Sequence, residues 1–369
     1  MWLPKRAISS GALSLRPAQY MKAVVARGNV AVLDSKRSRP RIRDDDLMVR
    51  TVAIALNPTD WKSVSYGRAA DSCILGCDYA GIVEEVGPRL GNQWRPGDRV
   101  FGCGHGANIT NPDDGVFAEY AAVKGDLQMR IPRGLSFEDA STMPLGLITV
   151  GQGLFQKALQ LDMPAVGKKS NSIPVLIYGG ATATGTLAIQ LAKLAGYTVI
   201  TTCSPEWFSD VKDLGADLVF DYHDHTVGSQ IRRATNNTLR YAWDTISIPG
   251  SAQICADALS TYSSDQLRYG NLLPVKSPRS DVVSATTVMY TVFGRDFMFG
   301  TQKMSASQED HEFGRQFYKL SQSLIEQGHL KPHPAYVGQG GLKGAVEGLK
   351  VLQEGVRRGK LVYRISDTS

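Results

Sequence analysis

The chain has 369 residues, more than one ordinary domain holds, so we expect two hydrophobic cores. Its 43% apolar and 21% charged residues exclude a disordered chain, and no apolar run approaches the roughly 20 residues of a membrane span. The formal charge of +6 comes without a long basic block or basic residues interleaved with aromatics, which excludes the nucleic-acid-binding classes and favours anionic small molecules.

The first 20 residues are interpreted as an N-terminal extension. Lys5, Arg6 and Arg16, with several Ser and Leu and no acid before Asp34, are also typical of a mitochondrial presequence. The alternatives are a disordered extension and an upstream start codon, because Met21 opens the run Met-Lys-Ala-Val-Val, which is typical of a first strand. Without a presequence, a cytoplasmic location is expected.

The five cysteines are odd in number and lack the C-x₂-C spacing of a zinc knuckle. Free thiols in a reducing compartment are therefore expected at Cys73, Cys77, Cys103, Cys203 and Cys255.

Residues 21 to about 155 are predicted to form a β-rich first domain. Its β-type runs are separated by Gly, Pro, Asn and Asp, and they are Leu47 to Ala55, Gly81 to Val86, Asp98 to Phe101 and Phe117 to Val123. Residues 151 to about 163 are predicted as a helix that leads out of this domain.

The stretch that follows predicts a mononucleotide-binding βαβ unit. Val175 to Gly179 forms a short buried strand, and Leu187, Leu191 and Leu194 then follow the period of a helix. Gly196 ends this helix, and a second strand, Tyr197 to Cys203, follows directly. Strand, glycine turn, helix and strand in this order indicate the first half of a dinucleotide-binding fold.

The turn itself indicates a phosphate site. Gly179 and Gly180 allow a sharp turn off the strand, and Gly185 allows the helix to pack close to the sheet. The free N–H groups of Ala181 and of the helix start then face a bound pyrophosphate. Thr182, Ala183 and Thr184 depart from the usual glycine or valine, so hydroxyls replace part of the bare-backbone cradle. The alternative is a tight connection with no ligand.

The end of the second strand bears on the choice of cofactor. NAD-binding units carry Asp or Glu there, whereas this chain has Cys203-Ser204-Pro205, which favours NADPH. Ser204 has an equal structural alternative as a helix N-cap with Pro205 at the first helical position. Further along the chain, the cation of Lys212 and the phenol of Tyr222 can reach the 2′-phosphate or flank the adenine. The negative charge of Glu206, by contrast, disfavours a phosphate beside it. The remaining contacts predicted for this end are Trp207, Lys212 and Tyr222.

The rest of the chain continues the alternation of strands and helices. Asp217 to Phe220, Leu239 to Trp243 and Leu267 to Leu273 are predicted strands, with helices around Gln230 and Ala256. The prediction is a doubly wound parallel sheet, a Rossmann domain spanning residues 156–307. A long amphipathic helix from about 308 to Gly328 and a strand, Leu361 to Ile365, are expected to return to the first domain as residues 308–369.

Several motifs in this order resemble the medium-chain dehydrogenase/reductase superfamily over nearly the whole chain. They are Asn57-Pro-Thr-Asp-Trp-Lys62, Gly76-Cys-Asp-Tyr-Ala-Gly81, Gly97-Asp-Arg-Val-Phe-Gly102, Phe117-Ala-Glu-Tyr120, Ile131-Pro-Arg-Gly-Leu-Ser-Phe-Glu138 and Gly359-Lys-Leu-Val362. The turn after Tyr178, with Cys203-Ser-Pro, Phe220-Asp-Tyr222 and Asn237-x-Leu-Arg-Tyr241, resembles the fungal trans-acting enoyl reductases of the lovastatin-pathway type.

The resemblance implies that the β-rich part is a GroES-like catalytic domain. It also implies an NADPH-dependent, trans-acting enoyl reductase of secondary metabolism, which reduces the α,β-double bond of a polyketide acyl thioester. The thioester is held on the acyl carrier domain of a partner polyketide synthase or synthase–peptide synthetase hybrid. No His lies beside Cys77-Asp78 and the four-cysteine lobe is missing, so we expect no metal. A monomer is favoured.

The resemblance also implies roles for individual residues. Lys62 is the best candidate to anchor the cofactor or stabilise the enolate, its alternative being an exposed lysine after a turn. Thr149 corresponds to a threonine at the nicotinamide and substrate cleft, its alternative being a helix-start hydroxyl. No single proton donor is visible, which leaves water. Further cofactor contacts are expected at Thr59, Asp60, Leu272, Leu273, Leu361 and Val362, and further substrate contacts at Val150, Gly151, Gln152, Gly153, Leu154, Phe155, Gln156, Thr291, Val292 and Phe293. Their apolar members are equally good core residues.

Two alternative functions stay open. One is a stand-alone NADPH-dependent reductase of free enones or quinones. The other is a non-redox scaffold or cyclisation partner of the synthase. Because carrier domains are acidic, Lys276, Arg279 and Arg295 are candidate docking residues for the leading hypothesis.

Overall fold

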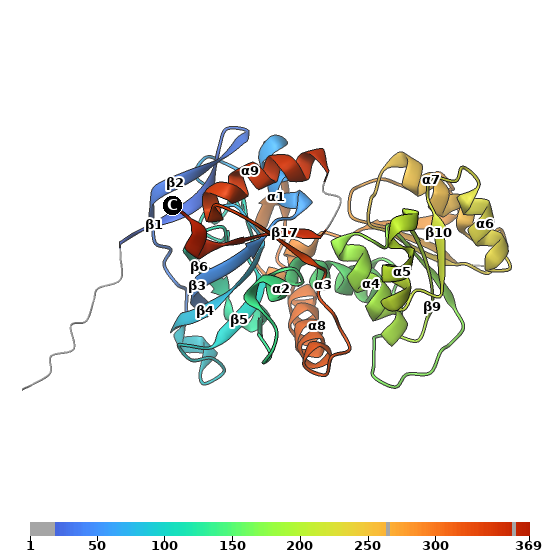
Figure 1. The fold of residues 1–369 in the computed structure, drawn as a ribbon, viewed down its shortest axis with the longest axis horizontal. Helices are drawn as coiled ribbons and strands as arrows, with labels where there is room; N and C mark the ends of the chain where they lie inside the picture. Colours follow the sequence, from blue (N-terminus) through green and yellow to red (C-terminus); the bar gives the residue numbers. More distant parts are fainter. Residues whose placement is uncertain (1–18, 263–265, 356–358) are drawn as a thin grey trace, which may run out of the picture.

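The computed structural model describes residues 19–262, 266–355 and 359–369, and these form two lobes that lie side by side (Figure 1). The predicted N-terminal extension lies almost wholly outside the described residues. One lobe contains the N-terminal strands and the last strand of the chain, and the other contains a parallel sheet with its helices.

The parallel sheet has six strands in the order β10-β9-β8-β11-β12-β13. All its neighbouring strands are parallel. The strand order reverses beside β8, and in such sheets ligands bind at the carboxyl ends of the strands where the order reverses. This arrangement confirms the predicted doubly wound Rossmann fold. The strands are β8 Pro174–Tyr178, β9 Thr198–Cys203, β10 Leu218–Asp221, β11 Tyr241–Asp244, β12 Leu267–Asn271 and β13 Val282–Thr286.

Helices cover both faces of this sheet because β8 is buried on both sides. Val175 and Ile177 belong to the core that includes α4, whereas Leu176 and Tyr178 belong to the core under α6 and α7. This alternation is the period of two that a strand requires. The helices are α4 Ala183–Leu194, α5 Phe208–Asp213, α6 Val227–Ala234 and α7 Pro249–Ala258, with the short turn η4 Pro205–Trp207.

The other lobe is built on a sheet in the order β16-β17-β3-β4-β5-β7, and β6 pairs with the first half of β3, whose last residues pair with β17. Strand β17 comes from the end of the chain and pairs antiparallel with β3, where Val362 lies opposite Ala55. This pairing confirms that the last strand returns to the first domain. The bounds are β1 Tyr20–Arg27, β2 Val30–Ser38, β3 Asp46–Ala55, β4 Asp78–Val86, β5 Arg99–Cys103, β6 Tyr120–Lys124, β7 Gln128–Arg130, β16 Ala335–Gly338 and β17 Lys360–Arg364.

Two details of this lobe differ from the sequence predictions. The helix expected from residue 151 begins earlier, as α3 Pro144–Val150, and continues as the π-helical turn η3 Gly151–Lys157. Proline at the first helical position starts it, because proline lacks the N–H that would have no partner there. The predicted strand at Phe117 starts only at Tyr120, since Ala118 makes a single bridge to Ala23.

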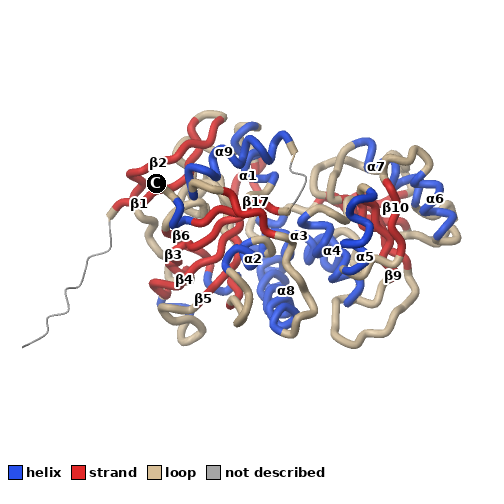
Figure 2. The backbone as a smooth tube through the Cα atoms, viewed as in Figure 1, coloured by secondary structure: helices blue, strands red, loops and turns tan. Residues whose placement is uncertain are grey.

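The largest hydrophobic core runs from one lobe into the other. It joins Phe101 of β5 and Leu147 of α3 to Phe317 of α8 and to Leu187 of α4. Figure 2 shows α3, α4 and α8 between the strands of the two lobes. The amphipathic helix predicted from 308 is α8 Gln308–Glu326, which buries Phe317 and Leu324 and begins at Ser307, whose hydroxyl accepts from the Asp310 amide. The lobes therefore share packed side chains rather than a bare linker.

The remaining elements are short, except for α9, which the sequence analysis did not identify. They are α1 Pro58–Ser65, η1 Pro88–Leu90, η2 Gly125–Leu127, α2 Phe137–Ser141, η5 Met289–Phe293, β14 Phe297–Phe299, β15 Gln302–Met304, α9 Gly341–Glu354 and η6 Ile365–Asp367. All five cysteines are buried free thiols. In the described part of the chain, no helix has the length and apolar character needed to cross a bilayer.

Candidate active site

The glycine turn after β8 leaves no room for side chains. A Cβ at Gly180 would lie 2.0 Å from the Thr201 hydroxyl oxygen, and one at Gly185 would lie 2.2 Å from the carbonyl oxygen of Gly179. Gly179 itself has a positive φ of 80°, which favours glycine. The turn therefore brings bare backbone close to the first turn of α4, whose N–H groups suit an anion.

Thr182 has a structural task in this turn. Its hydroxyl accepts from the Gly185 amide at 2.9 Å as the N-cap of α4, and donates to Thr245 at 3.0 Å. Ala181, Thr182, Ala183 and Thr184 are all partly exposed, so a ligand can reach them. The turn therefore has the capping contact of a purely structural connection, and its residues are also accessible to a ligand.

The residues predicted for the 2′-phosphate are partly brought together. The Ser204 hydroxyl donates to the Tyr222 oxygen at 3.4 Å and makes no cap bond to η4. Glu206 and Lys212 are both exposed, and in the described structure no hydrogen bond or ion pair links Lys212 to Ser204 or Tyr222. Sequence reasoning missed His223, whose ring lies 4.0 Å from that of Tyr222. Pro205 and Trp207 lie in the same short turn.

A buried carboxylate shapes the loops after β11 and β12. Asp244 accepts hydrogen bonds from Ser251 at 2.6 Å, from Tyr269 at 2.7 Å and from the amide of Ser247 at 2.9 Å. The Ser247 hydroxyl accepts in turn from the amide of Leu272 at 2.9 Å. Leu272, with Leu273 beside it, is therefore fixed at the carboxyl edge of the sheet. An Asp directly after a buried strand was the available sequence signal for Asp244.

In the other lobe, α1 presents the predicted catalytic loop. Thr59 and Lys62 are half-buried, and Asp60 is buried. The Lys62 ammonium lies 5.6 Å from the centre of the Trp61 ring, and burial, with the charge of Arg68, lowers the pKa of Lys62. Lys62 forms no ion pair within the described residues, so its charge is open to an anionic ligand.

Tyr290, which sequence reasoning missed, lies at the centre of this region. Its phenol oxygen is 2.9 Å from the Thr59 hydroxyl and 3.5 Å from the Cys77 sulfur. Its ring stacks on His105 with the ring centres 4.2 Å apart, and burial lowers the pKa of His105 to about 3. No sequence signal was available, because a lone aromatic residue in an apolar run is typical of core.

A buried ion pair supports the same region from behind. Lys360 of β17 pairs with Asp78 of β4 and also donates to the carbonyl of Thr142 at 3.2 Å. Asp78 accepts further bonds from the Asn57 side chain at 2.9 Å and from the amide of Leu145 at 2.7 Å. The carboxylate therefore ties α1, α3 and β17 together. Leu361 and Val362 follow Lys360 as buried residues, and the Leu361 carbonyl accepts from the amide of Leu56 at 2.9 Å.

The predicted substrate residues fall into two groups. Thr149 is half-buried on α3, and Gln156 is half-buried and donates to Asp310 at 3.0 Å. The others are buried, and Gln152 donates to Thr291 at 3.1 Å, which brings the two predicted substrate segments together. The buried members are Val150, Gly151, Gln152, Gly153, Leu154, Phe155, Thr291, Val292 and Phe293.

Comparison with known proteins identifies the family. Residues 43–133 match the alcohol dehydrogenase GroES-like domain, and residues 183–262 match the zinc-binding dehydrogenase model. The trans-enoyl reductase resD of Aspergillus sclerotiorum is 45% identical over 361 residues, 94% of this chain and 100% of that protein. The trans-enoyl reductase TOXD of Cochliobolus carbonum is 51% identical over 279 residues, 75% of this chain and 92% of that protein. This chain belongs to the trans-enoyl reductases.

Solved structures show the same fold for this trans-enoyl reductase family member. A putative zinc-dependent alcohol dehydrogenase from Rhizobium etli CFN 42 aligns with a TM-score of 0.74 at 26% identity, over 93% of this chain and 98% of that chain. The CurK enoyl reductase aligns with a TM-score of 0.72 at 18% identity, over 94% of this chain and 99% of that chain. Both confirm the expected medium-chain dehydrogenase/reductase fold.

The residues of this family member fit a nicotinamide dinucleotide better than a metal. The glycine turn is a cradle that any Cβ would fill, and it lies at the carboxyl edge of a parallel sheet. By contrast, no group of three or more His, Cys, Asp or Glu among the described residues is placed to hold a metal ion. Cys77 faces Tyr290, and Asp78 is occupied by Lys360.

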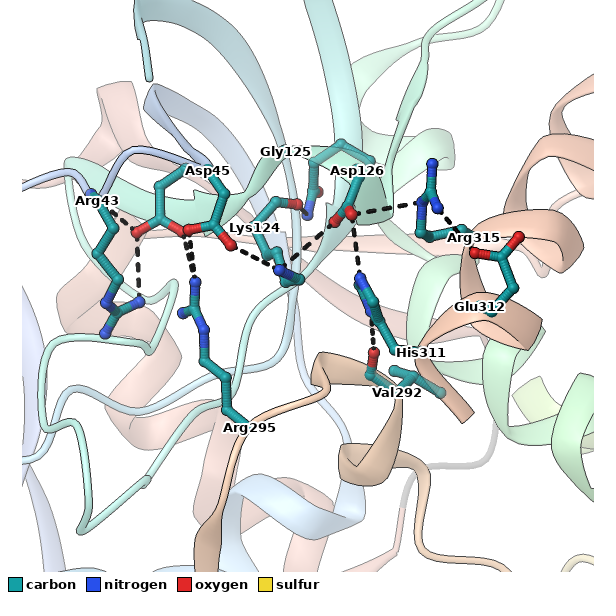
Figure 3. A network of polar contacts seen from close by, with 12 residues as sticks. Arg43, Asp45, Lys124, Gly125, Asp126, Val292, Arg295, His311, Glu312 and Arg315 are labelled. Atoms are coloured by element: carbon teal, nitrogen blue, oxygen red, sulfur yellow. Dashed lines mark hydrogen bonds and ion pairs between the residues drawn. The ribbon is translucent and has the colours of Figure 1, made fainter. Parts of the chain in front are cut away.

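An ionic network holds the segment after Tyr290 to the catalytic lobe (Figure 3). Asp45 pairs with Lys124 at 2.7 Å and with Arg295 at 2.8 Å. Asp126 pairs with His311 at 3.0 Å, and the other ring nitrogen of His311 lies 2.7 Å from the carbonyl oxygen of Val292. We call these residues, Asp45, Lys124, Asp126, Arg295 and His311, the ionic brace.

Two of the predicted carrier-docking residues, Arg279 and Arg295, form ion pairs within the chain. Arg295 is paired with Asp45 and Asp46, and Arg279 is paired with Asp281 at 2.6 Å. Their charges are therefore largely compensated within the chain, which leaves less free positive charge for an acidic partner than the sequence indicates.

Proposed function

We propose that this chain is a trans-acting enoyl reductase that uses NADPH to reduce the α,β-double bond of a polyketide acyl thioester. The observation that carries the proposal is the near full-length match to trans-enoyl reductases, 45% identical over 94% of this chain. The glycine cradle after β8 supports it, because reduction of a C=C bond needs a bound hydride donor.

NADPH is proposed over NADH on the basis of β9. Its end carries Ser204 instead of the carboxylate that binds a free 2′-hydroxyl, and the Ser204 hydroxyl lies beside Tyr222. These two oxygens, with His223 at the same edge, are polar groups suited to a 2′-phosphate. When bound, the reduced cofactor supplies a hydride to the β-carbon of the thioester.

The catalytic lobe supplies the charge stabilisation. As electrons reach the thioester carbonyl, negative charge develops on its oxygen and needs a donor or cation. We assign this role to Lys62, whose half-buried ammonium has no acid partner among the described residues. Thr149 is assigned to the rim of the same cleft, and the buried segments at 150–156 and 291–293 support its walls.

The partner is proposed to be the acyl carrier domain of a polyketide synthase, on which this chain would act in trans. A monomer in the cytoplasm is the proposed working form. The proposed domains are residues 21–155 and 308–369 for the catalytic unit and 156–307 for the Rossmann unit.

The test is a titration of the purified protein with NADPH and NADH, followed by addition of a crotonyl thioester on pantetheine or on a carrier domain. We expect tight binding of NADPH and thioester-dependent loss of its absorbance. Equal activity on small free enones would support the alternative of a stand-alone enone or quinone reductase. Failure to bind either nucleotide would contradict the proposal and favour a non-redox scaffold.

A further inference from the structure

Four polar side chains form a line through the interior of the catalytic lobe. The hydroxyl of Thr59 lies 2.9 Å from the phenol oxygen of Tyr290, which lies 3.5 Å from the sulfur of Cys77. The Cys77 thiol faces the carboxyl of Asp60 and interacts with it. Each of the middle groups can accept a proton on one side and donate one on the other. We call Asp60, Cys77, Tyr290 and Thr59 the buried line.

The inner end of this line is the buried carboxyl of Asp60. Asp60 is 2% exposed, and its Oδ2 accepts a hydrogen bond from the backbone N–H of Asn57 at 2.7 Å. Its Oδ1 has no hydrogen bond of ordinary geometry among the described residues. Burial, reinforced by the negative charge of Asp78, raises the pKa of Asp60 to about 7.

The surrounding charges do not neutralise Asp60. Lys360 of β17 is paired with Asp78. Its positive charge lowers the pKa of Asp60, but this effect is smaller than that of burial. His105 stacks on Tyr290 but stays neutral, because burial lowers the pKa of its ring to about 3. Among the described residues, Cys77 is a polar side chain that interacts with both Asp60 and Tyr290.

The outer end of the line is open. Asp60, Cys77 and Tyr290 are each at most 6% exposed, whereas Thr59 is half-buried. Thr59 also lies three residues before Lys62 on α1, a spacing that puts both residues on one face of a helix. The line thus ends at a hydroxyl beside the cation to which we assign the enolate.

We propose that the Thr59 hydroxyl protonates the α-carbon of the reduced thioester, and that Tyr290, Cys77 and Asp60 replace the proton it loses. The inference rests on the proposed function. It makes Thr59 a catalytic residue, while Tyr290, Cys77 and Asp60 act through it as positioning residues.

The step balances within the protein. When the β-carbon has gained a hydrogen and an electron pair, the former double-bond pair resides on the α-carbon and carbonyl oxygen. A C–H bond forms at the α-carbon while the O–H bond of Thr59 breaks, and Thr59 takes a proton from Tyr290. Tyr290 takes one from Cys77, and Cys77 takes one from Asp60, which becomes a carboxylate. Water reaching Thr59 after product release returns one proton along the same line.

The test is a single turnover of the full-length protein with NADPH and crotonyl-pantetheine in D₂O, with the product read by NMR. Tyr290→Phe removes the phenol oxygen but keeps the ring stacked on His105, and Thr59→Val removes the terminal hydroxyl. We expect the rate to fall about 100-fold in each variant, the size of a general-acid contribution. We also expect deuterium on both faces of the α-carbon, because water then supplies the proton.

Tyr318→Phe is the matched control. Tyr318 is also buried, its oxygen lies 3.1 Å from the Cys103 sulfur, and it donates to the carbonyl of Pro144 at 3.0 Å. Among the described residues its hydroxyl contacts Cys103 and Pro144 and no member of the buried line, so this variant should keep the wild-type rate and single-face labelling. The same result in Tyr290→Phe would overturn the relay. No turnover by the unaltered protein would overturn the proposed function instead.

Infrared spectra of the protein without substrate give a second readout. The carboxyl C=O band of Asp60 should disappear as the pH rises through about 7, and the S–H band of Cys77 should shift with it. Both changes should be missing from Asp60→Asn, which keeps an acceptor for the Asn57 amide. An S–H band that ignores the ionisation of Asp60 would contradict the contact on which the relay depends.

Discussion

The two lobes build their parts of the candidate site in different ways. In the Rossmann lobe, one continuous unit from β8 through α4 to β9 provides the glycine turn and Ser204. The part of the site in the catalytic lobe depends on distant segments: the Thr59 hydroxyl meets the phenol of Tyr290, 231 positions away, and Lys360 pairs with Asp78, 282 positions away. The first part is held by local backbone geometry, whereas the second depends on buried contacts between distant segments. The consequences of substitution should therefore differ between the lobes.

The largest effect is expected where distant segments meet. Lys360→Ala leaves the Asp78 carboxylate buried without its cation, and breaking a buried pair in this way costs about 3–5 kcal/mol of unfolding free energy. Urea unfolding measures it. The control is Lys193→Ala, because the pair of Lys193 with Asp217 is exposed and such pairs contribute about 0–1 kcal/mol. Similar losses of unfolding free energy in the two variants would contradict the expected difference between the buried and the exposed ion pair.

The second prediction concerns the pH dependence of stability. Because the pKa of Asp60 is about 7 in the folded state and near 4 in the unfolded chain, the folded state holds more protons between these values, and stability falls as the pH rises. Asp60→Asn removes this loss, so its stability relative to wild type should rise by about 2 kcal/mol from pH 5 to pH 7. Denaturant unfolding at both pH values measures the change.

The control for this measurement is Asp224→Asn. Hydrogen bonds from Thr226 and Gln230 lower the pKa of Asp224, so its contribution to stability has the opposite sign and is lost only as the pH falls through acidic values. A flat difference between Asp60→Asn and wild type across this pH range would show that the Asp60 carboxyl is ionised throughout it.

In the Rossmann lobe, Gly185→Ala tests whether backbone proximity holds the cradle. Its Cβ would meet the carbonyl of Gly179, and such overpacking costs about 1–3 kcal/mol. We also expect weaker binding of NADPH, measured by cofactor fluorescence. Gly250→Ala is the matched control, since no atom lies within 4 Å of the added Cβ. Unchanged binding of NADPH by Gly185→Ala would show that the glycine turn does not hold the cofactor.

The smallest expected effect is a change in the preference for NADPH over NADH. Ser204→Asp places a carboxylate at the end of β9, where it repels a 2′-phosphate and can bind a 2′-hydroxyl. The ratio of NADPH to NADH affinity should fall about tenfold or more, equal to about 1.4 kcal/mol. An unchanged ratio would place the 2′-phosphate away from Ser204.

The same contrast explains what the sequence could predict. The doubly wound parallel sheet follows from local patterns, and the structure confirms it. The last strand, which was expected to return to the first domain, pairs with β3. Tyr290 was missed because no local pattern reports a partner more than 200 residues away. Helix α9 was missed because its glycines weaken the helical pattern, yet a Cβ at Gly348 would clash with Tyr363, so packing requires them.

The ionic brace has a mechanical consequence for the buried line. The two ring nitrogens of His311 lie 2.7 Å from the Val292 carbonyl oxygen and 3.0 Å from the Asp126 carboxylate. These contacts join η5, and with it Tyr290, to the lobe that carries Thr59 and Cys77. The position of Tyr290 beside Thr59 is therefore held by contacts outside the glycine cradle, so Gly185→Ala should leave the buried line in place.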